Sequence, residues 1–236
     1  MSDKDPDKQY KLRKAYWDER AASCDGVHKV LNVTNAEELA GLEIEEFLAA
    51  LPSYDGKTVC DIGAGIGRYT AEFAKKAKHV TAVDFLEEYT EINKETNGMM
   101  GNIDFMTADI VKAEFSPDSF DLIYTNYLMQ YLTDDEACKF AHNALRWMKE
   151  DGYLFFRELS GTPLQGPEEA VDNPSICRSV AVYKEMFSNI CQPIDGSDEM
   201  LKLSLYDSKQ VQCVKKVLGR ETDFYFIYQK IRCKRD

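Results

Sequence analysis

The stretch of this chain that most constrains its fold is residues 59–67, where a short apolar strand runs directly into closely spaced glycines. It reads Val-Cys-Asp-Ile-Gly-Ala-Gly-Ile-Gly, so that Asp61 is followed by three alternating glycines. Glycines in this pattern let the backbone turn sharply and approach a ligand without interference from Cβ atoms. The next segment, Arg68–Lys78, has helical character, so the turn opens a helix N-terminus that suits a carboxylate or phosphate.

The spacing of the glycines indicates the kind of ligand. A dinucleotide fingerprint requires Gly-x-Gly-x-x-Gly, and its third glycine position falls here on Arg68. An acidic residue followed by Ile-Gly-x-Gly-x-Gly instead favours a nucleoside cofactor without a pyrophosphate, which points to S-adenosylmethionine. We expect one wall of the cofactor site to consist of Asp61, Gly63, Ala64, Gly65, Gly67 and Arg68.

Strand-like and helix-like segments alternate along most of the chain. This alternation implies right-handed crossovers and a mostly parallel sheet. Helices are expected at Glu87–Asn97 and Asp134–Lys149, and the last two strands look antiparallel. The predicted fold is one α/β, Rossmann-like domain with a seven-stranded sheet, helices on both faces and an antiparallel C-terminal end. The predicted strands are Thr58–Ile62, His79–Asp84, Ile103–Thr107, Phe120–Thr125, Tyr153–Arg157, Met200–Tyr206 and Phe224–Lys230.

The start of the chain precedes this alternation. Residues 1–9 read as a disordered polar tail, and the folded domain is expected to span residues 10–236. Residues 10–50 have helical spacing, with Thr34 as an N-cap and Glu37 completing a capping box. The expected buried stripe consists of Leu39, Leu42, Phe47, Leu48 and Leu51.

Acidic residues stand at the ends of the next strands, where ligands bind in open α/β sheets. Asp84 occupies the position from which a carboxylate accepts hydrogen bonds from ribose hydroxyls; its alternative role is to cap the next helix. Asp109 can accept from an adenine amino group while Ile110 packs on the ring, and a capping role is again the alternative. Further cofactor contacts are expected from Phe85 and Asn126.

The segment after residue 125 supplies aromatic side chains to the reacting end of the cofactor. The faces of Tyr127 and Tyr131 suit a sulfonium or ammonium through cation–π attraction of about 0.5–2 kcal/mol. Methyl transfer to an amine is a direct displacement, so positioning dominates its catalysis. The amine must arrive unprotonated beside a hydrogen-bond acceptor, for which Tyr16, Tyr131 and Glu158 are the candidates.

Composition excludes several classes of partner. The 236 residues carry a formal net charge of −12, which disfavours nucleic acids. No apolar run approaches the roughly 20 residues that span a bilayer. The seven cysteines are scattered, so we expect no disulfide framework, no metal and a reducing, cytoplasmic location. The expected assembly is a monomer or weak homodimer.

With these residues in place, the chain resembles class I S-adenosylmethionine-dependent methyltransferases and, more closely, the first domain of phosphoethanolamine N-methyltransferases. The similarity is densest at 51–70 and continues at Asp84-Phe85, 101–109, 125–132 and 155–158. The Tyr16-Trp17 pair also matches. The resemblance implies that residues 10–50 form a lid over bound ligands, that Tyr16 helps to orient the amine, and that phosphoethanolamine is monomethylated on the way to phospholipids.

The chain departs from this family where the acceptor phosphate is expected. The usual Asn-Pro-Thr-His-Tyr-Arg is here Asn-Pro-Ser-Ile-Cys-Arg at 173–178, which keeps only Arg178 of the last three residues. Arg157, Lys184 and Lys29 are the other local cations. The expected substrate contacts are Trp17, Tyr127, Gln130, Arg157, Glu158, Arg178 and Tyr183, and the expected catalytic residues are Tyr16 and Tyr131.

Three alternatives stay open at this point. Asp25-Gly26 and the segment 171–178 are similar to protein α-N-terminal methyltransferases, whose acidic residues hold a cationic N-terminus. Another small amine or amino acid is a second possible acceptor. A protein that binds the cofactor without turning it over is a third, from a different functional class.

Overall fold

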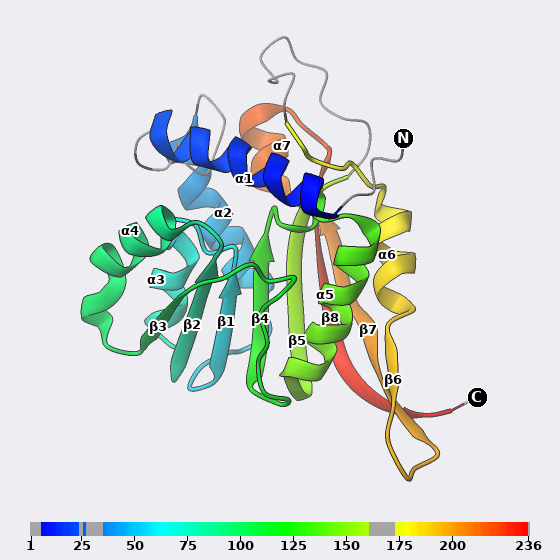
Figure 1. Cartoon of the computed structure of the whole chain (residues 1–236). Coiled ribbons are helices and arrows are strands. Elements are labelled where there is room, and N and C mark those ends of the chain that lie inside the picture. Colours follow the sequence, from blue (N-terminus) through cyan, green and yellow to red (C-terminus); the bar gives the residue numbers. More distant parts are fainter. Residues whose placement is uncertain (1–5, 24–25, 27–34, 161–172, 236) are drawn as a thin grey trace.

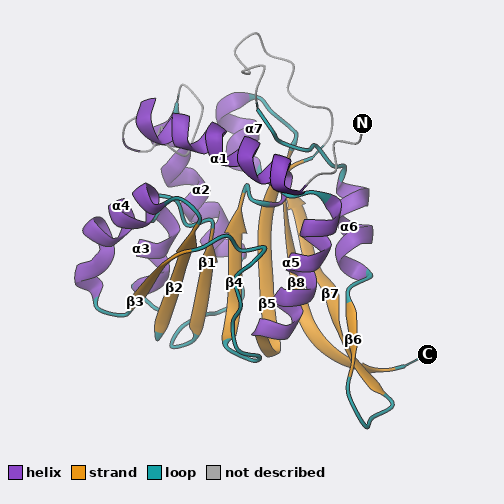
Figure 2. Ribbon diagram, viewed as in Figure 1, coloured by secondary structure: helices purple, strands orange, loops and turns teal. Residues whose placement is uncertain are grey.

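An eight-stranded sheet with helices on both faces organises the chain in a computed structural model that describes residues 6–23, 26, 35–160 and 173–235 (Figures 1 and 2). The strand order is β3-β2-β1-β4-β5-β8-β7-β6. The first five of these pair in parallel, and the last three are antiparallel. The strands are β1 (Thr58–Ile62), β2 (His79–Asp84), β3 (Ile103–Thr107), β4 (Phe120–Asn126), β5 (Met148–Leu159), β6 (Cys191–Pro193), β7 (Glu199–Gln210) and β8 (Asp223–Lys234).

The Rossmann-like α/β architecture predicted from the sequence is confirmed, with one strand more than expected. All seven predicted strands are present, and the additional β6 pairs with β7 at the edge of the sheet. Its three residues are all exposed, so it has no buried alternation by which a sequence pattern could reveal it. Strand β5 also begins earlier than expected, because the preceding helix ends at Trp147 rather than at Lys149.

The helices frame the sheet. They are α1 (Pro6–Ser23), α2 (Ala36–Ala50), α3 (Arg68–Ala74), α4 (Glu87–Asn97), α5 (Asp134–Trp147), α6 (Val180–Ser188) and α7 (Gln212–Leu218), with short 3-10 turns η2 (Gly98–Met100) and η3 (Met129–Tyr131). Helix α3 is shorter than predicted, because residues 75–78 turn to lead the chain into β2. None of the described helices is both long enough and apolar enough to cross a membrane.

The N-terminal region differs from expectation in its helix boundaries. Helix α1 already begins at Pro6, inside the segment expected to be a disordered tail, and the fixed φ of proline favours the first position of a helix. Helix α2 begins after Asn35, which makes no side-chain cap. The predicted cap Thr34 lies outside the described residues. On the expected stripe of α2, Leu39 and Phe47 are fully buried.

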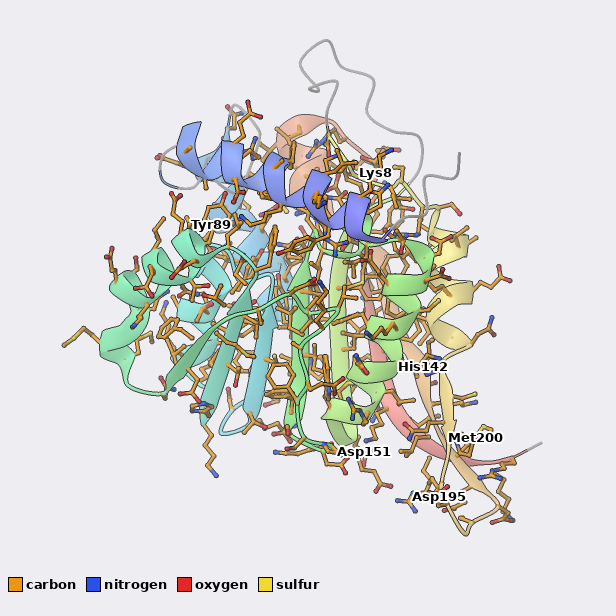
Figure 3. The ribbon with its side chains drawn as sticks, viewed as in Figure 1. Lys8, Tyr89, His142, Asp151, Asp195 and Met200 are labelled. Atoms are coloured by element: carbon orange, nitrogen blue, oxygen red, sulfur yellow. The ribbon has the colours of Figure 1, made fainter. Side chains whose placement is uncertain are left out.

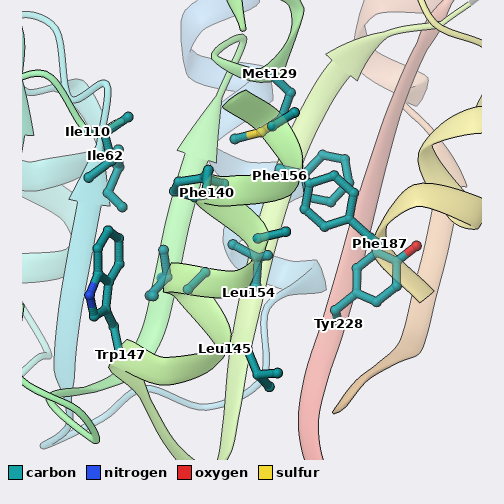
Figure 4. Close-up of a cluster of buried hydrophobic side chains, with 14 of the residues drawn as sticks. Ile62, Ile110, Met129, Phe140, Leu145, Trp147, Leu154, Phe156, Phe187 and Tyr228 are labelled. Atoms are coloured by element: carbon teal, nitrogen blue, oxygen red, sulfur yellow. The ribbon is translucent and has the colours of Figure 1, made fainter. Parts of the chain in front are cut away.

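Two apolar cores lie on opposite faces of the sheet because successive strand residues point to opposite sides. Phe156 points toward α5 and α6, where its ring lies 4.4 Å from that of Phe187 and 4.8 Å from that of Phe226 (Figure 4). Its neighbour Phe155 points toward α2, α3 and α7 and stacks on Tyr124 at 4.8 Å. The sheet is thereby fixed from both sides.

Helix α1 lies apart from these two layers. It crosses above the carboxyl ends of the parallel strands, while Asp151 lies at the opposite end of the sheet (Figures 1 and 3). Near the end of α1, Ala21 packs against Leu86 and Tyr89, and these three residues form a small cluster separate from the two cores. Tyr89 of α4 lies beneath α1 in Figure 3. Helix α1 therefore covers the edge of the sheet at which open α/β folds bind their ligands.

Candidate functional site

A cavity lies at the carboxyl ends of β1, β2 and β4, against α1. It encloses about 1030 Å³ of space between atoms, including its open mouth. Its place at the carboxyl ends of the strands is where open α/β sheets bind small molecules. The residues that line it are Arg13, Trp17, Ile62, Gly63, Ala64, Gly65, Ile66, Arg68, Tyr69, Val83, Asp84, Phe85, Tyr89, Ala108, Asp109, Ile110, Asn126, Tyr127, Leu128, Tyr131 and Leu132.

The glycine turn after β1 forms one wall of this cavity and is anchored to the end of β2. The N–H groups of Gly63 and Ala64 both donate to the Val83 carbonyl oxygen, at 2.8 and 3.0 Å. The N–H of Gly65 donates to Asp84 Oδ2 at 2.8 Å. Two adjacent strand ends thus hold the turn in one position.

Gly67 ends the turn, and a group of buried polar side chains lies behind it. Its φ is 88°, and a Cβ added there would lie 2.1 Å from Asn93 Oδ1. Asn97 Nδ2 donates to the Gly67 carbonyl at 3.1 Å, and Asn93 Nδ2 donates to Thr70 Oγ1. Thr70 in turn donates to Asp61 Oδ2 at 2.6 Å. Asp61 and Gly67 therefore support the wall from behind and do not line the cavity.

Asp84 occupies the wall at the end of β2. Its Oδ1 accepts the Leu86 N–H at 3.0 Å, in addition to the Gly65 bond of Oδ2. Helix α4 begins after Leu86, whose own side chain makes no cap, and Asp84 bonds to the backbone directly before this helix as well as to the glycine turn. Burial raises the pKa of Asp84 to about 6, although these N–H groups oppose the shift. Burial likewise raises the pKa of Asp61 to about 7.

Asp109 and Arg13 meet beside Ile110, which also lines the cavity. Asp109 Oδ1 accepts the Val111 N–H, whereas the buried Oδ2 accepts no hydrogen bond. Arg13 Nη2 lies 3.8 Å from that oxygen. The same guanidinium forms two hydrogen bonds, at 2.8 and 3.0 Å, with Glu136 at the start of α5. Arg13 therefore fastens α1 to this corner of the cavity.

Aromatic rings from α1, α4 and the loop after β4 gather on the side of the cavity beneath α1. The ring of Trp17 lies 5.3 Å from that of Tyr131 and 6.4 Å from that of Tyr89. Tyr16 does not line the cavity, but its ring lies 6.0 Å from Tyr131. Burial, with Tyr16 and Glu158 nearby, raises the pKa of Tyr131 well above its ordinary value, so this phenol is neutral at physiological pH.

Glu158 lies outside the cavity lining and organises the loop that carries Tyr131. Its Oε1 accepts the N–H groups of Leu128 and Met129 at 2.8 and 2.7 Å, and Oε2 accepts that of Gln130 at 3.1 Å. Burial raises the pKa of Glu158 to about 7 in spite of these bonds. Gln130 is buried and takes part in this loop through its backbone.

Arg178 fixes the same loop from the other side. Its Nη1 donates to the Met129 carbonyl at 2.7 Å and its Nη2 to that of Leu132 at 2.6 Å, while Nε donates to Asp134. The buried Tyr183 ring lies 5.7 Å from the guanidinium. The structure therefore places both residues around the loop after β4, and neither among the cavity-lining side chains.

Arg157 is fully buried and also lies outside the cavity lining. Its guanidinium pairs with Glu43 and Asp223, at 3.0 and 2.6 Å. It also donates to Asn126 Oδ1 at 3.3 Å and lies 3.7 Å above the Tyr127 ring. Both acidic partners are already in place, so Arg157 does not present an unpaired charge to a phosphate. Among the other cations considered, Lys184 is not in the lining, and Lys29 lies outside the described residues.

The cavity has further lining residues beyond those expected from the sequence. Most of them are sequence neighbours of the glycine-turn and strand-end residues that were expected to line the cavity. Arg13 and Tyr89 carried no such signal, because their contribution depends on how α1 and α4 pack. The unexpected residues are Arg13, Ile62, Ile66, Tyr69, Val83, Tyr89, Ala108, Leu128 and Leu132. Within the described residues, no His, Cys, Asp or Glu side chains form a group that could hold a metal ion.

The sequence of this chain is similar to those of known methyltransferases. A family model described as a methyltransferase domain matches residues 59–152. Phosphoethanolamine N-methyltransferase 1 of Triticum aestivum is 35% identical over 229 residues, which cover 96% of this chain and 45% of the relative. The Caenorhabditis elegans phosphoethanolamine N-methyltransferase 1 is 38% identical over 157 residues, covering 66% of this chain and 33% of the relative. The matched regions thus span less than half the length of these relatives.

Solved structures agree with the sequence comparisons. Phosphoethanolamine N-methyltransferase 1 of Haemonchus contortus, in complex with phosphoethanolamine and S-adenosylhomocysteine, matches with a TM-score of 0.90 and 31% identity. The match covers 97% of this chain and 50% of that chain. A SAM-dependent methyltransferase of Leishmania major shares the fold, with a TM-score of 0.74 and 22% identity over 96% of this chain and 85% of its own.

The packing behind the glycine turn yields a stability prediction. We expect Gly67→Ala to lower the free energy of unfolding by about 1–2 kcal/mol for a Cβ at positive φ, and by about 1–3 kcal/mol more for the overlap with Asn93. Gly101→Ala is the matched control, since φ there is 78° and nothing lies within 4 Å of the added Cβ. Urea unfolding of both variants measures the difference, and equal losses would contradict the clash.

Proposed function

This chain belongs to the class I S-adenosylmethionine-dependent methyltransferases and is a homologue of the phosphoethanolamine N-methyltransferases; on that premise we propose that it transfers a methyl group from S-adenosylmethionine to a small amine. Phosphoethanolamine is the leading acceptor, and N-methylphosphoethanolamine is the corresponding product. The observation that carries the proposal is the likeness to the Haemonchus contortus enzyme along 97% of the chain. That protein is known with phosphoethanolamine and S-adenosylhomocysteine.

The cavity contains acceptors that fit a nucleoside cofactor. Asp84 has hydrogen-bonding capacity beyond its two backbone donors, because each carboxylate oxygen carries two lone pairs. Asp109 Oδ2 is buried and accepts no hydrogen bond, as an acceptor for an amino group would be before binding. Asp84 would therefore hold the ribose, and Asp109 and Ile110 would hold the adenine.

The other end of the cavity suits the amino-acid part of the cofactor. Arg68 lines the cavity directly after the glycine turn, and a guanidinium is a strong donor to a carboxylate. When bound, S-adenosylmethionine supplies an electrophilic methyl group on a sulfonium. Trp17 and Tyr131 line the cavity with their rings 5.3 Å apart, and aromatic rings attract cations.

The chain's own residues would act mainly by orienting the acceptor and excluding water. Tyr131 stays neutral, so its oxygen accepts a hydrogen bond from an unprotonated amine without acting as a strong base. Glu158 and Arg178 hold the loop that carries this phenol in one conformation. Helix α1 covers the cavity with Arg13 and Trp17, which reduces the access of water.

The decisive test of this function is release of S-adenosylhomocysteine with a panel of acceptors. The panel contains phosphoethanolamine, unphosphorylated ethanolamine, other small amines and a peptide with a free N-terminus. We expect turnover of phosphoethanolamine to exceed that of the others. Turnover of the peptide or of an unphosphorylated amine alone would refute the acceptor assignment. Tight cofactor binding with no turnover of any member would indicate a cofactor-binding protein without activity.

The role of Tyr131 predicts a selective kinetic defect. We expect Tyr131→Phe to lower kcat about 100-fold, because the variant keeps the ring and loses the oxygen that positions the amine. Affinity for S-adenosylhomocysteine should change little, since the aromatic face remains. Steady-state kinetics and calorimetry on the same preparation separate the two effects. An unchanged kcat would remove Tyr131 from the reaction.

The pKa of Asp84 predicts how cofactor binding depends on pH. Ribose hydroxyls donate to the ionised carboxylate, so below a pKa of about 6 binding must displace a proton. We expect S-adenosylhomocysteine affinity to be constant well above that value and to fall by up to about tenfold per pH unit below it. Asp84→Asn should weaken binding by about 1–3 kcal/mol at high pH and reduce the pH dependence. Calorimetry between about pH 5 and about pH 8 measures both; equal pH profiles would contradict the assignment.

A further inference from the structure

Glu43 is a charged residue at the centre of the buried face of α2. It lies four residues after Leu39 and four before Phe47, so all three share one side of the helix. The exposed fraction is 1% for Leu39 and 0% for Glu43 and Phe47. A carboxylate on an apolar stripe is costly unless it is paired. Its retention at this position therefore calls for a specific partner.

Glu43 has two partners, and one of them lines the cavity. Its Oε2 lies 3.2 Å from Arg68 Nη2, and its Oε1 lies 3.0 Å from Arg157 Nη1. Arg68 Nη2 also donates to the Ala40 carbonyl on the same helix, at 3.1 Å. Helix α2 thus holds the Arg68 guanidinium through a side chain and through its backbone.

The second partner supports a different part of the cavity. Arg157 lies 3.7 Å above the ring of Tyr127, and both Arg157 and the Tyr127 hydroxyl bond to Asp223. Tyr127 has a φ of 56°, a conformation that costs a non-glycine residue free energy and persists only where its surroundings hold it. Arg157, fixed by Glu43, is part of those surroundings.

Opposite charges face each other in this group, with three guanidinium groups to two carboxylates. Two carboxylates, Glu43 and Asp223, face the guanidinium groups of Arg68 and Arg157, and Arg220 Nε lies 4.0 Å from Asp223. Burial alone would lower the pKa of Arg157, but Tyr127, Glu43 and Asp223 raise it above its ordinary value, so Arg157 stays charged. Removing the charge of Glu43 leaves two arginines facing each other without the carboxylate between them.

We propose that Glu43 is a positioning residue for the cofactor site. It orients Arg68 beside the glycine turn and, through Arg157, holds Tyr127 in the wall of the cavity. Glu43 does not line the cavity and acts through these arginines. The inference rests on the proposed function only in that the ligand is S-adenosylmethionine or its product. The single carboxylate of Glu43 in α2 thus contacts the arginines that support two sides of the cavity.

The test is the affinity of the full chain for S-adenosylhomocysteine, measured by calorimetry on Glu43→Gln. An amide has one acceptor oxygen for two arginines, so we expect affinity to fall about tenfold or more. Glu46→Gln is the matched control on the same helix. The Glu46 carboxylate accepts the Gln212 and Cys213 N–H groups, both at 2.7 Å, and does not line the cavity. Its loss should leave cofactor affinity unchanged.

A double-mutant cycle separates positioning from a general loss of structure. If Glu43 acts through Arg68, Glu43→Gln should cost much less affinity in an Arg68→Met background than in the wild-type chain. Additive losses would overturn the proposal.

Glu43→Asp keeps the buried charge and shortens its reach, and it serves where the glutamine variant does not fold. We expect reduced affinity in this variant too, and wild-type affinity in either single variant would refute the role.

These outcomes distinguish the inference from the function on which it rests. If the wild-type chain does not bind S-adenosylhomocysteine, the cofactor assignment itself is wrong. If the wild-type chain binds it and the Glu43 variants bind equally well, the function stands and the role of Glu43 is wrong.

Discussion

The hydrogen bond from the Gly65 N–H to the Asp84 carboxylate joins two strand ends into one binding surface. It depends on a backbone that can pass through positive φ at the turn, and on a carboxylate kept out of water at the end of β2. Burial of that carboxylate raises its pKa to about 6, so its capacity to accept hydrogen bonds depends on pH close to neutrality. The same group therefore shapes the turn and, in the proposed function, would accept hydrogen bonds from the ribose.

Buried carboxylates recur along this edge of the sheet, and each holds backbone, a hydroxyl group or a cation in place. Glu158 accepts three N–H groups of the loop after β4, Asp61 accepts from Thr70 beneath the glycine turn, and Glu43 pairs with two arginines. The two faces of the sheet are built from aromatic and aliphatic side chains instead. The apolar cores fix where the strands end, and the polar groups fix the loops that follow. Because of this division, substitutions in the apolar cores should affect the strands, whereas substitutions of the buried carboxylates should affect the loops that follow them.

The strands and the cavity wall at the glycine turn could be predicted because they depend on local sequence. The glycine turn, Asp84 and Asp109 each follow a short apolar run, and a parallel sheet brings the ends of such runs together. The partners of the arginines could not be read in this way. Arg178 stands in the segment that the family resemblance assigns to the phosphate, and Arg157 is a further cation nearby, yet the partners of both come from distant segments. Asp223 and Met129 are separated from these two arginines by 66 and 49 residues.

Helix α1 contributes to the cavity from a part of the sequence that carries no strand-end motif. Arg13 and Trp17 reach the cavity from α1, and Arg13 holds that helix to Glu136 and approaches Asp109. The pKa of Glu136 is lowered because its bonds to Arg13 and to the Thr133 N–H outweigh its burial, which alone would raise it. The Arg13 pair therefore persists at the pH values at which Asp84 is ionised. Helix α1 is thus held at one side of the cavity by a charged contact, while Trp17 of the same helix contributes an aromatic side chain to the cavity lining.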